Sequence, residues 1–256
     1  MDENEKLVFK LACRSGVLIL ESGGETYRAE ETVRFICSSA GIEANVLALP
    51  TGILVTADIN GEPQSSSIKR IKKRSTNLYS LNEINDISRK FVSGGINVHE
   101  ALDAVDALSN KKTVNKWFLI LCAGFSSFFF ALLFEGSFFD SIVALIASCS
   151  VQTMLLYSKR TDIYNFTSNL FSGFIIALYA VVSVSLFSMG NTEAIIVGGI
   201  LPYLPGLAMT NAIRDTMMGD LVSGISRLGD VLLSAVCLAV GAGVVFAVYV
   251  YLGGVV

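Results

Sequence analysis

The sequence is poor in charge and has almost no histidine. Of its 256 residues, 16% are charged and 52% are hydrophobic, and His99 is the single histidine. Soluble domains carry about 25% charged residues, so this composition does not fit a wholly soluble chain. With one histidine, neither a histidine-based metal centre nor a Ser-His-Asp triad is expected.

Cysteine pairs and catalytic motifs are also missing. The cysteines stand far apart without a CxxC pair, which argues against a zinc site and a disulfide framework and favours small apolar packing residues. They are Cys13, Cys37, Cys122, Cys149 and Cys237. The sequence has no nucleotide-binding motif, no HExxH and no GxSxG. We expect no metal, no cofactor, no enzymatic activity, no direct use of ATP and no nucleic-acid partner.

The charge that is present lies mostly in the first half. Residues 1–116 hold 15 of the 19 Lys and Arg and 15 of the 22 Asp and Glu, whereas residues 117–256 hold 4 and 7. This split predicts a cytoplasmic α+β domain over residues 1–112 and an all-α transmembrane domain over residues 113–256. Residues 1–6 are acidic and no small-residue cleavage site follows an early apolar run, so no signal peptide is expected.

Apolar periodicity predicts the elements of the first domain. A 3.6-residue period predicts helices over residues 3–21 and 25–40, and Gly23-Gly24 ends the first of them. Alternation predicts three strands, and Asn60-Gly61 is a strong signal for the turn of a hairpin. The strands are expected at residues 45–49, 53–59 and 66–71.

Two closing helices complete this domain in the order ααβββαα. Ser80 with Glu83, and Asn97 with Glu100, have the spacing of a capping box at a helix start.

Five apolar stretches follow the first domain. Each approaches or exceeds the ~17–25 residues needed to span a bilayer, and Trp117 is placed to anchor the first at the interface. The spans are expected at residues 117–134, 138–157, 166–187, 194–214 and 228–252.

The basic residues predict the orientation of these spans. With the N-terminus inside, the loops at 135–137 and 188–193 and the C-terminus lie outside and contain no Lys or Arg. The inside loops contain the other basic residues, Lys159, Arg160, Arg214 and Arg227. All 19 then lie on one side, which predicts a multi-pass protein of the cell (inner or plasma) membrane with a cytoplasmic N-terminus and an external C-terminus.

The fourth span is interrupted near its middle. Pro202 and Pro205 lack amide donors and clash with the preceding turn, and Gly206 adds backbone freedom. Such a break persists only where it is buried or lines a cavity, and it recurs at transporter binding sites. A half-helix starting near Gly206 would aim free N–H groups at the break and favour an anion such as a carboxylate. A structural proline kink is the alternative interpretation.

Polar residues follow the break. Asn211, Arg214 and Asp215 lie within one turn, and Asp220 and Arg227 continue the pattern. They form either the inner end of a transport path or an ordinary charged cytoplasmic loop. If they are buried, we expect Arg214 to pair with Asp215 or Asp220, because a lone charge costs ~2.5–3.5 kcal/mol at a helix centre. In the transport interpretation, Asp215 is the acid best placed to couple substrate movement to a charge or proton.

The junction between the first two helices is unusually polar. Its candidate residues are Ser22, Glu25, Thr26, Arg28 and Glu31. A solvated turn is the simpler interpretation of these residues taken alone. Similarly, the basic run from Lys69 to Arg74 could contact anionic lipid headgroups or protect a strand edge by charge.

Three blocks of this sequence carry a resemblance. The first runs from Ser22 through Gly-Gly-Glu-Thr-Tyr-Arg-x-Glu-Glu to Thr32, and the second is Pro50-Thr-Gly. The third comprises Leu204-Pro-Gly, Asn211-Ala-Ile-Arg-Asp, Gly219-Asp and Ser223-Gly-Ile. Together they resemble the threonine/serine exporter family, specifically its N-terminal, YjjP-like part, over nearly the whole chain.

That resemblance implies a cytoplasmic domain followed by a membrane bundle that exports small metabolites. Members of the family are fused, or split into a long and a short subunit, and this chain looks like the long subunit of the split form. The resemblance associates fused members with threonine and serine, and split members with succinate and related dicarboxylates.

Two hypotheses follow. The first is a subunit of a secondary transporter that exports a small carboxylate-bearing metabolite across the lipid bilayer. It would assemble as an oligomer with a short membrane subunit of the same family, and small residues offer close-packing surfaces to that partner. These are Gly198, Gly199, Gly241 and Gly243. The alternative is a membrane-anchored sensor or scaffold subunit whose soluble domain is the working part.

Overall fold

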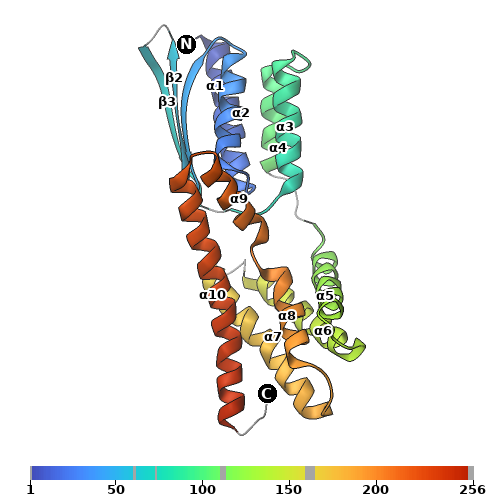
Figure 1. Cartoon of the computed structure of the whole chain (residues 1–256). Coiled ribbons are helices and arrows are strands. Elements are labelled where there is room, and N and C mark those ends of the chain that lie inside the picture. Colours follow the sequence, from blue (N-terminus) through green and yellow to red (C-terminus); the bar gives the residue numbers. More distant parts are fainter. Residues whose placement is uncertain (1, 60–61, 73, 110–113, 159–164, 253–256) are drawn as a thin grey trace. The chain divides into compact units, whose positions relative to one another are not determined.

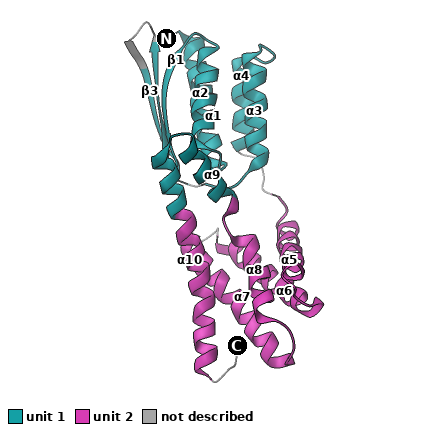
Figure 2. Cartoon of the chain, in the orientation of Figure 1, with its two compact units in different colours: residues 1–112, 207–229 teal, residues 113–206, 230–256 magenta. Residues whose placement is uncertain are grey.

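The structure is a computed structural model, which describes residues 2–59, 62–72, 74–109, 114–158 and 165–252 (Figure 1). The chain divides into two compact units, residues 1–112 with 207–229 and residues 113–206 with 230–256 (Figure 2). The first of these boundaries falls where the charge pattern changes. Residues 207–229, which the sequence analysis assigned to the transmembrane domain, pack with the first unit.

The first unit contains seven helices or strands before the membrane-capable helices begin. In chain order they are α1 Glu3–Glu21, α2 Thr26–Ser38, β1 Glu43–Leu49, β2 Gly52–Ile59, β3 Glu62–Arg70, α3 Leu78–Val92 and α4 Val98–Ser109. Helix α9, Gly206–Met217, and the start of α10, Leu221–Tyr251, complete the unit.

The sheet of the first unit is antiparallel in the order β1-β2-β3. Its inner face carries Ile53, Val55 and Ala57 of β2, which are buried under α1. Helix α2 packs on β1. Gly16 allows α1 to approach α2 closely, because a Cβ atom there would lie 2.7 Å from Val33 Cγ2. The core of the unit therefore lies between α1, α2 and one face of the sheet, and it continues to α3 and α4 through Ile84 and Leu102.

The helix caps correct one prediction and confirm another. Asn97 and Glu100 exchange backbone-to-side-chain hydrogen bonds of 2.9 and 3.0 Å, as the spacing predicted. The box at Ser80 was wrong, because α3 begins at Leu78 and Asn77 Oδ1 accepts from Ser80 N. An Asn is as good an N-cap as Ser and stands one turn earlier. The predicted turn at residues 60–61 lies outside the described residues.

The second unit is a bundle of long apolar helices. It contains α5 Lys116–Leu133, α6 Phe138–Ser158, α7 Asn165–Phe187, α8 Thr192–Ile200, the 3-10 turn η1 Leu201–Tyr203 and the remainder of α10. Four helices of the described chain are long and apolar enough to cross a membrane, or up to five if the bent pair Thr192–Tyr203 and Gly206–Met217 forms one span. The outward apolar side chains include Trp117, which is 75% exposed. Lipid solvates such a surface, whereas water does not.

The last helix starts earlier than predicted. Helix α10 begins at Leu221, seven residues before the predicted start of the fifth span at residue 228. Residues 221–227 are therefore helical, and the predicted charged loop shrinks to a turn in which Gly219 has a φ of +92°. Hydropathy marks where lipid contact begins, and a polar helix can start before that point.

Glycines bring α7 and α10 together within the second unit. A Cβ atom on Gly173 would lie 2.0 Å from Leu238 O, and one on Gly241 would lie 2.0 Å from Leu170 O. Backbone therefore meets backbone on both sides of the crossing.

The other predicted packing glycines mostly serve the chain itself. A Cβ atom on Gly198 would meet Ala131, and one on Gly199 would meet Ile176. The prediction that these glycines and Gly241 face a partner was therefore wrong, because helices of this chain already fill the space. Gly243 has open space around it.

Candidate functional site

Helices α9 and α10 hold the turn between α1 and α2, and all of these contacts lie within the first unit. Gly23 has a φ of +80°, which ends α1 and leaves carbonyl groups without helical partners. Asn211 Nδ2 of α9 donates to Gly23 O at 2.8 Å, and Arg227 Nη2 of α10 donates to Gly24 O at 2.7 Å. A cation is favourable at this end of a helix because the macrodipole is negative there.

The start of α2 receives an anion from α9. Glu25 occupies the N-cap position but makes no side-chain capping bond. Instead, Asp215 Oδ1 accepts from Thr26 N at 3.2 Å. An acidic group at a helix N-terminus satisfies a free donor and interacts favourably with the positive end of the dipole. Asp215 therefore acts as a cap supplied from a segment 189 positions away.

Three ion pairs surround this turn. Asp215 Oδ2 lies 3.0 Å from Arg227 Nε, and these side chains are 0% and 6% exposed. Arg214 pairs with Glu25, whose other oxygen lies 3.6 Å from Arg28 Nη1. The Glu25 side chain is 5% exposed and that of Arg214 is 46% exposed. We call the five residues Glu25, Thr26, Arg214, Asp215 and Arg227 the turn cluster.

The expected pairing of Arg214 with Asp215 or Asp220 was wrong. Neighbouring residues of an α-helix point about 100° apart, so Arg214 and Asp215 reach different partners. Asp220 Oδ1 accepts from Ser223 N at 3.1 Å and so caps the start of α10.

Four buried polar atoms in and beside the turn cluster have no hydrogen-bond partner among the described residues. They are Thr26 Oγ1, Asp215 Oδ2, Ser223 Oγ and Arg227 Nε. Two of these atoms, Asp215 Oδ2 and Arg227 Nε, belong to the same ion pair. They lie close together but are not aligned for a hydrogen bond. Asp215 Oδ2 and Arg227 Nε compensate each other's charge, whereas buried hydroxyl groups such as Thr26 Oγ1 and Ser223 Oγ are usually satisfied by water or a ligand.

Other predicted residues lie outside the turn cluster. Pro202 lies in η1, Pro205 follows it, and Gly206 begins α9, so these three form the break itself. Ser22 is buried and its carbonyl accepts from Asn77 N, whereas Glu31 is exposed.

Sequence reasoning missed that the two polar motifs meet. It identified both motifs, but not the backbone carbonyls of Gly23 and Gly24 as acceptors. One part of the cluster, the ion pair of Asp215 with Arg227, could have been predicted. The two residues have opposite charges and lie on two helices joined by a short turn.

The comparisons with known proteins decide the family. The family described as "Putative threonine/serine exporter" matches residues 10–249. The chain belongs to the threonine/serine exporter family. This confirms the resemblance found in the sequence and, with the apolar helices, identifies a multi-pass membrane protein of an exporter family.

Individual relatives are distant and of two lengths. A "Probable threonine/serine exporter" of Mycobacterium tuberculosis is 23% identical over 99% of this chain and 47% of its own length. The "Threonine/serine exporter" of Corynebacterium glutamicum is 23% identical over 92% of this chain and 50% of its own length. The "Probable succinate transporter subunit YjjP" of Klebsiella aerogenes is 22% identical over 92% of each chain. This chain thus spans about half the length of the first two relatives, and no solved structure matches it.

Proposed function

We propose that this chain is a subunit of a secondary transporter that exports a small carboxylate-bearing metabolite. The names of its relatives specify threonine, serine and succinate, which share a carboxylate group. The family and these names indicate a transporter, and we assign the chain no catalytic activity.

The observation that carries this proposal is the buried pair of Asp215 and Arg227. Asp215 lies on α9, which follows the proline break, and Arg227 lies near the start of α10. Removing one partner of a buried pair leaves an uncompensated charge, so the two residues must change state together. A proton on Asp215 would neutralise it and free Arg227, whose planar guanidinium can bind a substrate carboxylate through two hydrogen bonds.

Under this proposal, proton binding at Asp215 and substrate binding at Arg227 are linked. The unpartnered Thr26 Oγ1 and Ser223 Oγ are nearby acceptors or donors for the same guest. A change in the bend between η1 and α9 would open the transport path to the substrate. Because α9 contacts the turn between α1 and α2, that turn would respond to the position of α9. Asp215 is then the coupling residue, and Asn211 and Arg214 hold the turn.

The substitution Asp215→Asn tests this assignment, because it keeps the shape and removes the charge. We expect export to fall at least tenfold while the protein still inserts in the membrane at wild-type levels. Asp103→Asn, at an exposed position of α4, is the matched control and should export normally. Wild-type export by the Asp215 variant across the pH range would contradict the role of Asp215.

We also propose that a second membrane part, such as a short subunit of the same family, completes the path. Support comes from the word "subunit" in the names of the relatives that match end to end, and from the longer relatives that this chain half covers. Reconstitution in liposomes tests it: export should require coexpression with that partner, and full export by this chain alone would refute it.

The orientation is part of the same proposal. The distribution of the 19 basic residues supports a cytoplasmic N-terminus and an external C-terminus.

The alternative, in which the chain is a sensor or scaffold, must be tested with point substitutions and not with a deletion of the first domain. Deleting residues 1–110 would remove Thr26 N from Asp215, Gly24 O from Arg227 and the Glu25 carboxylate from Arg214, so it would disturb the turn cluster itself. A variant such as Arg227→Gln that folds but transports normally would favour a sensor or scaffold whose first unit is the working part.

A further inference from the structure

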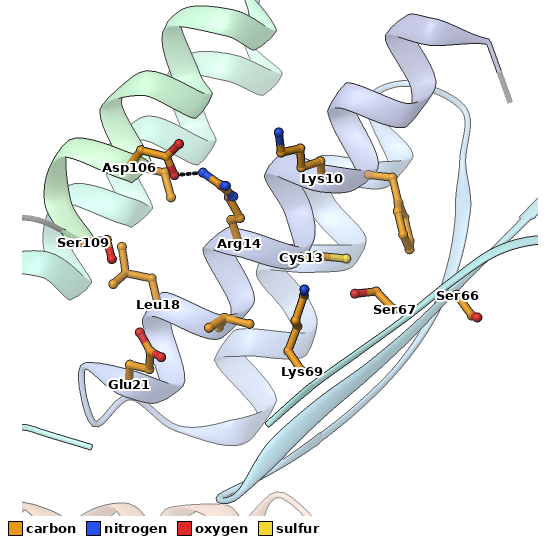
Figure 3. A pocket seen from close by; sticks show the side chains of 13 residues that line it. Lys10, Cys13, Arg14, Leu18, Glu21, Ser66, Ser67, Lys69, Asp106 and Ser109 are labelled. Atoms are coloured by element: carbon orange, nitrogen blue, oxygen red, sulfur yellow. Dashed lines mark hydrogen bonds and ion pairs between the residues drawn. The ribbon is translucent and has the colours of Figure 1, made fainter. Parts of the chain in front are cut away.

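A groove of about 680 Å³ runs along one side of α1 within the first unit (Figure 3). One wall is the stretch of α1 from Phe9 to Glu21, the second is the last part of β3, and the third is the end of α4. Ligand sites typically have volumes of about 300–1,000 Å³ and combine apolar walls with a few convergent polar groups. The groove has this character, because Val17 and Leu18 line it beside charged residues.

The wall formed by β3 is polar where a core would be apolar. The strand register places Lys69 opposite Ile53 and Ser67 opposite Val55, and both of these partners are buried. Directly opposed residues point to the same face of a sheet. Lys69 and Ser67 therefore occupy inward-facing positions, and Figure 3 shows Lys69 reaching from β3 toward Cys13 of α1. An inward lysine also protects an edge strand from pairing with other chains, a role that the experiment below separates.

The charges that line the groove are only partly paired. Arg14 of α1 is held by Asp106 of α4. Within the described part of the chain, Lys10 and Lys69 have no carboxylate partner and Glu21 has no cation partner. Burial raises the pKa of Glu21, and no neighbouring cation opposes that effect. An unpaired ammonium and an unpaired carboxylate thus face the same cavity.

We propose that this groove binds a small zwitterionic α-amino acid, with its carboxylate at Lys69 and Ser67 and its ammonium at Glu21. Arg14 neutralises Asp106, so Glu21 is the group whose charge disfavours a polyphosphate or a dianion. A monocarboxylate without an ammonium would leave Glu21 unpaired. The side chain of the amino acid would lie against Val17 and Leu18.

This site is placed to regulate the turn cluster. Glu21 is the last residue of α1, and the carbonyl groups of Gly23 and Gly24 that α9 and α10 hold follow directly. An amino acid bound at Glu21 would order the last turn of α1 and so change the stiffness of the turn that follows. Regulation in this sense rests on the proposed transport function, whereas binding in the groove does not.

Equilibrium dialysis of labelled L-threonine with the full chain in lipid nanodiscs tests the proposal. We expect saturable binding, weakened at least about tenfold by Lys69→Gln and by Glu21→Gln, since a hydrogen bond to a charged group is lost in each. Lys72→Gln and Glu3→Gln, which change exposed residues outside the groove, are the matched controls and should bind normally. Hydrogen exchange should slow in peptides from α1 and β3 when L-threonine is added.

Three outcomes would overturn the proposal. They are an absence of L-threonine binding at millimolar concentration, unchanged binding by both groove variants, and equally tight binding of succinate that Lys69→Gln weakens as it weakens L-threonine binding. If Lys69→Gln causes aggregation but leaves binding unchanged, Lys69 only protects the strand edge. Asp215→Asn separates this site from the transport path, because it should lower export at least tenfold and leave L-threonine binding in the groove intact. Binding without any export would refute the proposed function and leave the groove site standing.

Discussion

Loss of Arg227 should strongly destabilise the first unit. Arg227→Gln would leave the carboxylate of Asp215 buried without its cation and would remove the charged donor to Gly24 O. Breaking a buried ion pair by removing one partner costs about 3–5 kcal/mol, and these two losses overlap, so we do not add them. For a unit of this size a loss of 1 kcal/mol lowers Tm by about 2–4 °C, which predicts a decrease of at least about 6 °C.

Arg214→Gln is the internal comparison for this prediction. Arg214 also pairs with a carboxylate of the α1–α2 turn, but its side chain is half exposed, and Glu25 keeps Arg28 at 3.6 Å. Solvent therefore compensates most of what is lost. We expect Arg214→Gln to lower Tm by less than half as much as Arg227→Gln.

Thermal unfolding of the purified chain in mild detergent, followed by circular dichroism, measures both effects. The double variant Asp215→Asn with Arg227→Gln should be more stable than Arg227→Gln alone, because it no longer buries a lone charge. Equal losses for Arg214→Gln and Arg227→Gln, or a double variant no better than Arg227→Gln, would refute the reasoning about burial.

Three further predictions test other parts of the structure. Glu21→Gln should raise Tm at pH 7 without ligand, since the half-buried carboxylate has no cation partner. The gain should shrink as pH falls through the raised pKa of Glu21, because the wild-type carboxyl group then becomes neutral too; a lower Tm at pH 7 would contradict this. Gly241→Ala should lower Tm, because overpacking typically costs about 1–3 kcal/mol and its Cβ would lie 2.0 Å from Leu170 O, whereas Gly243→Ala has open space and should be neutral. Alkaline phosphatase fused after Val256 should be active, and a reporter there that works only in the cytoplasm would reverse the topology.

Local patterns were sufficient for most helices and strands. The first helix was predicted over residues 3–21 and is observed there, because its apolar period and the Gly23-Gly24 stop are both local signals. The start of α10 was missed, because a helix rich in polar residues has no hydropathy signal that distinguishes it from a loop.

The turn cluster could not be derived from local patterns. Both motifs stood out by their polarity, but their contact joins Thr26 to Asp215 across 189 positions. Because Arg214 is next to Asp215 in the sequence, the two were expected to form an ion pair. The actual partner, Arg227, depends on how tightly α9 and α10 fold against each other. A Cβ atom on Gly224 would lie 2.0 Å from Thr216 Oγ1, and that closeness shows only in three dimensions.

The crossing of α7 and α10 has a mechanical consequence. At Gly173 and Gly241 the helices touch through backbone, and neither glycine inserts a side chain into the facing helix. With no side chain between them at these two points, the helix axes approach as closely as backbone allows, and Ala177, Val181, Ala242 and Val245 pack together beside the crossing. A single methyl group at either glycine would therefore force the two backbones apart and loosen that neighbouring cluster.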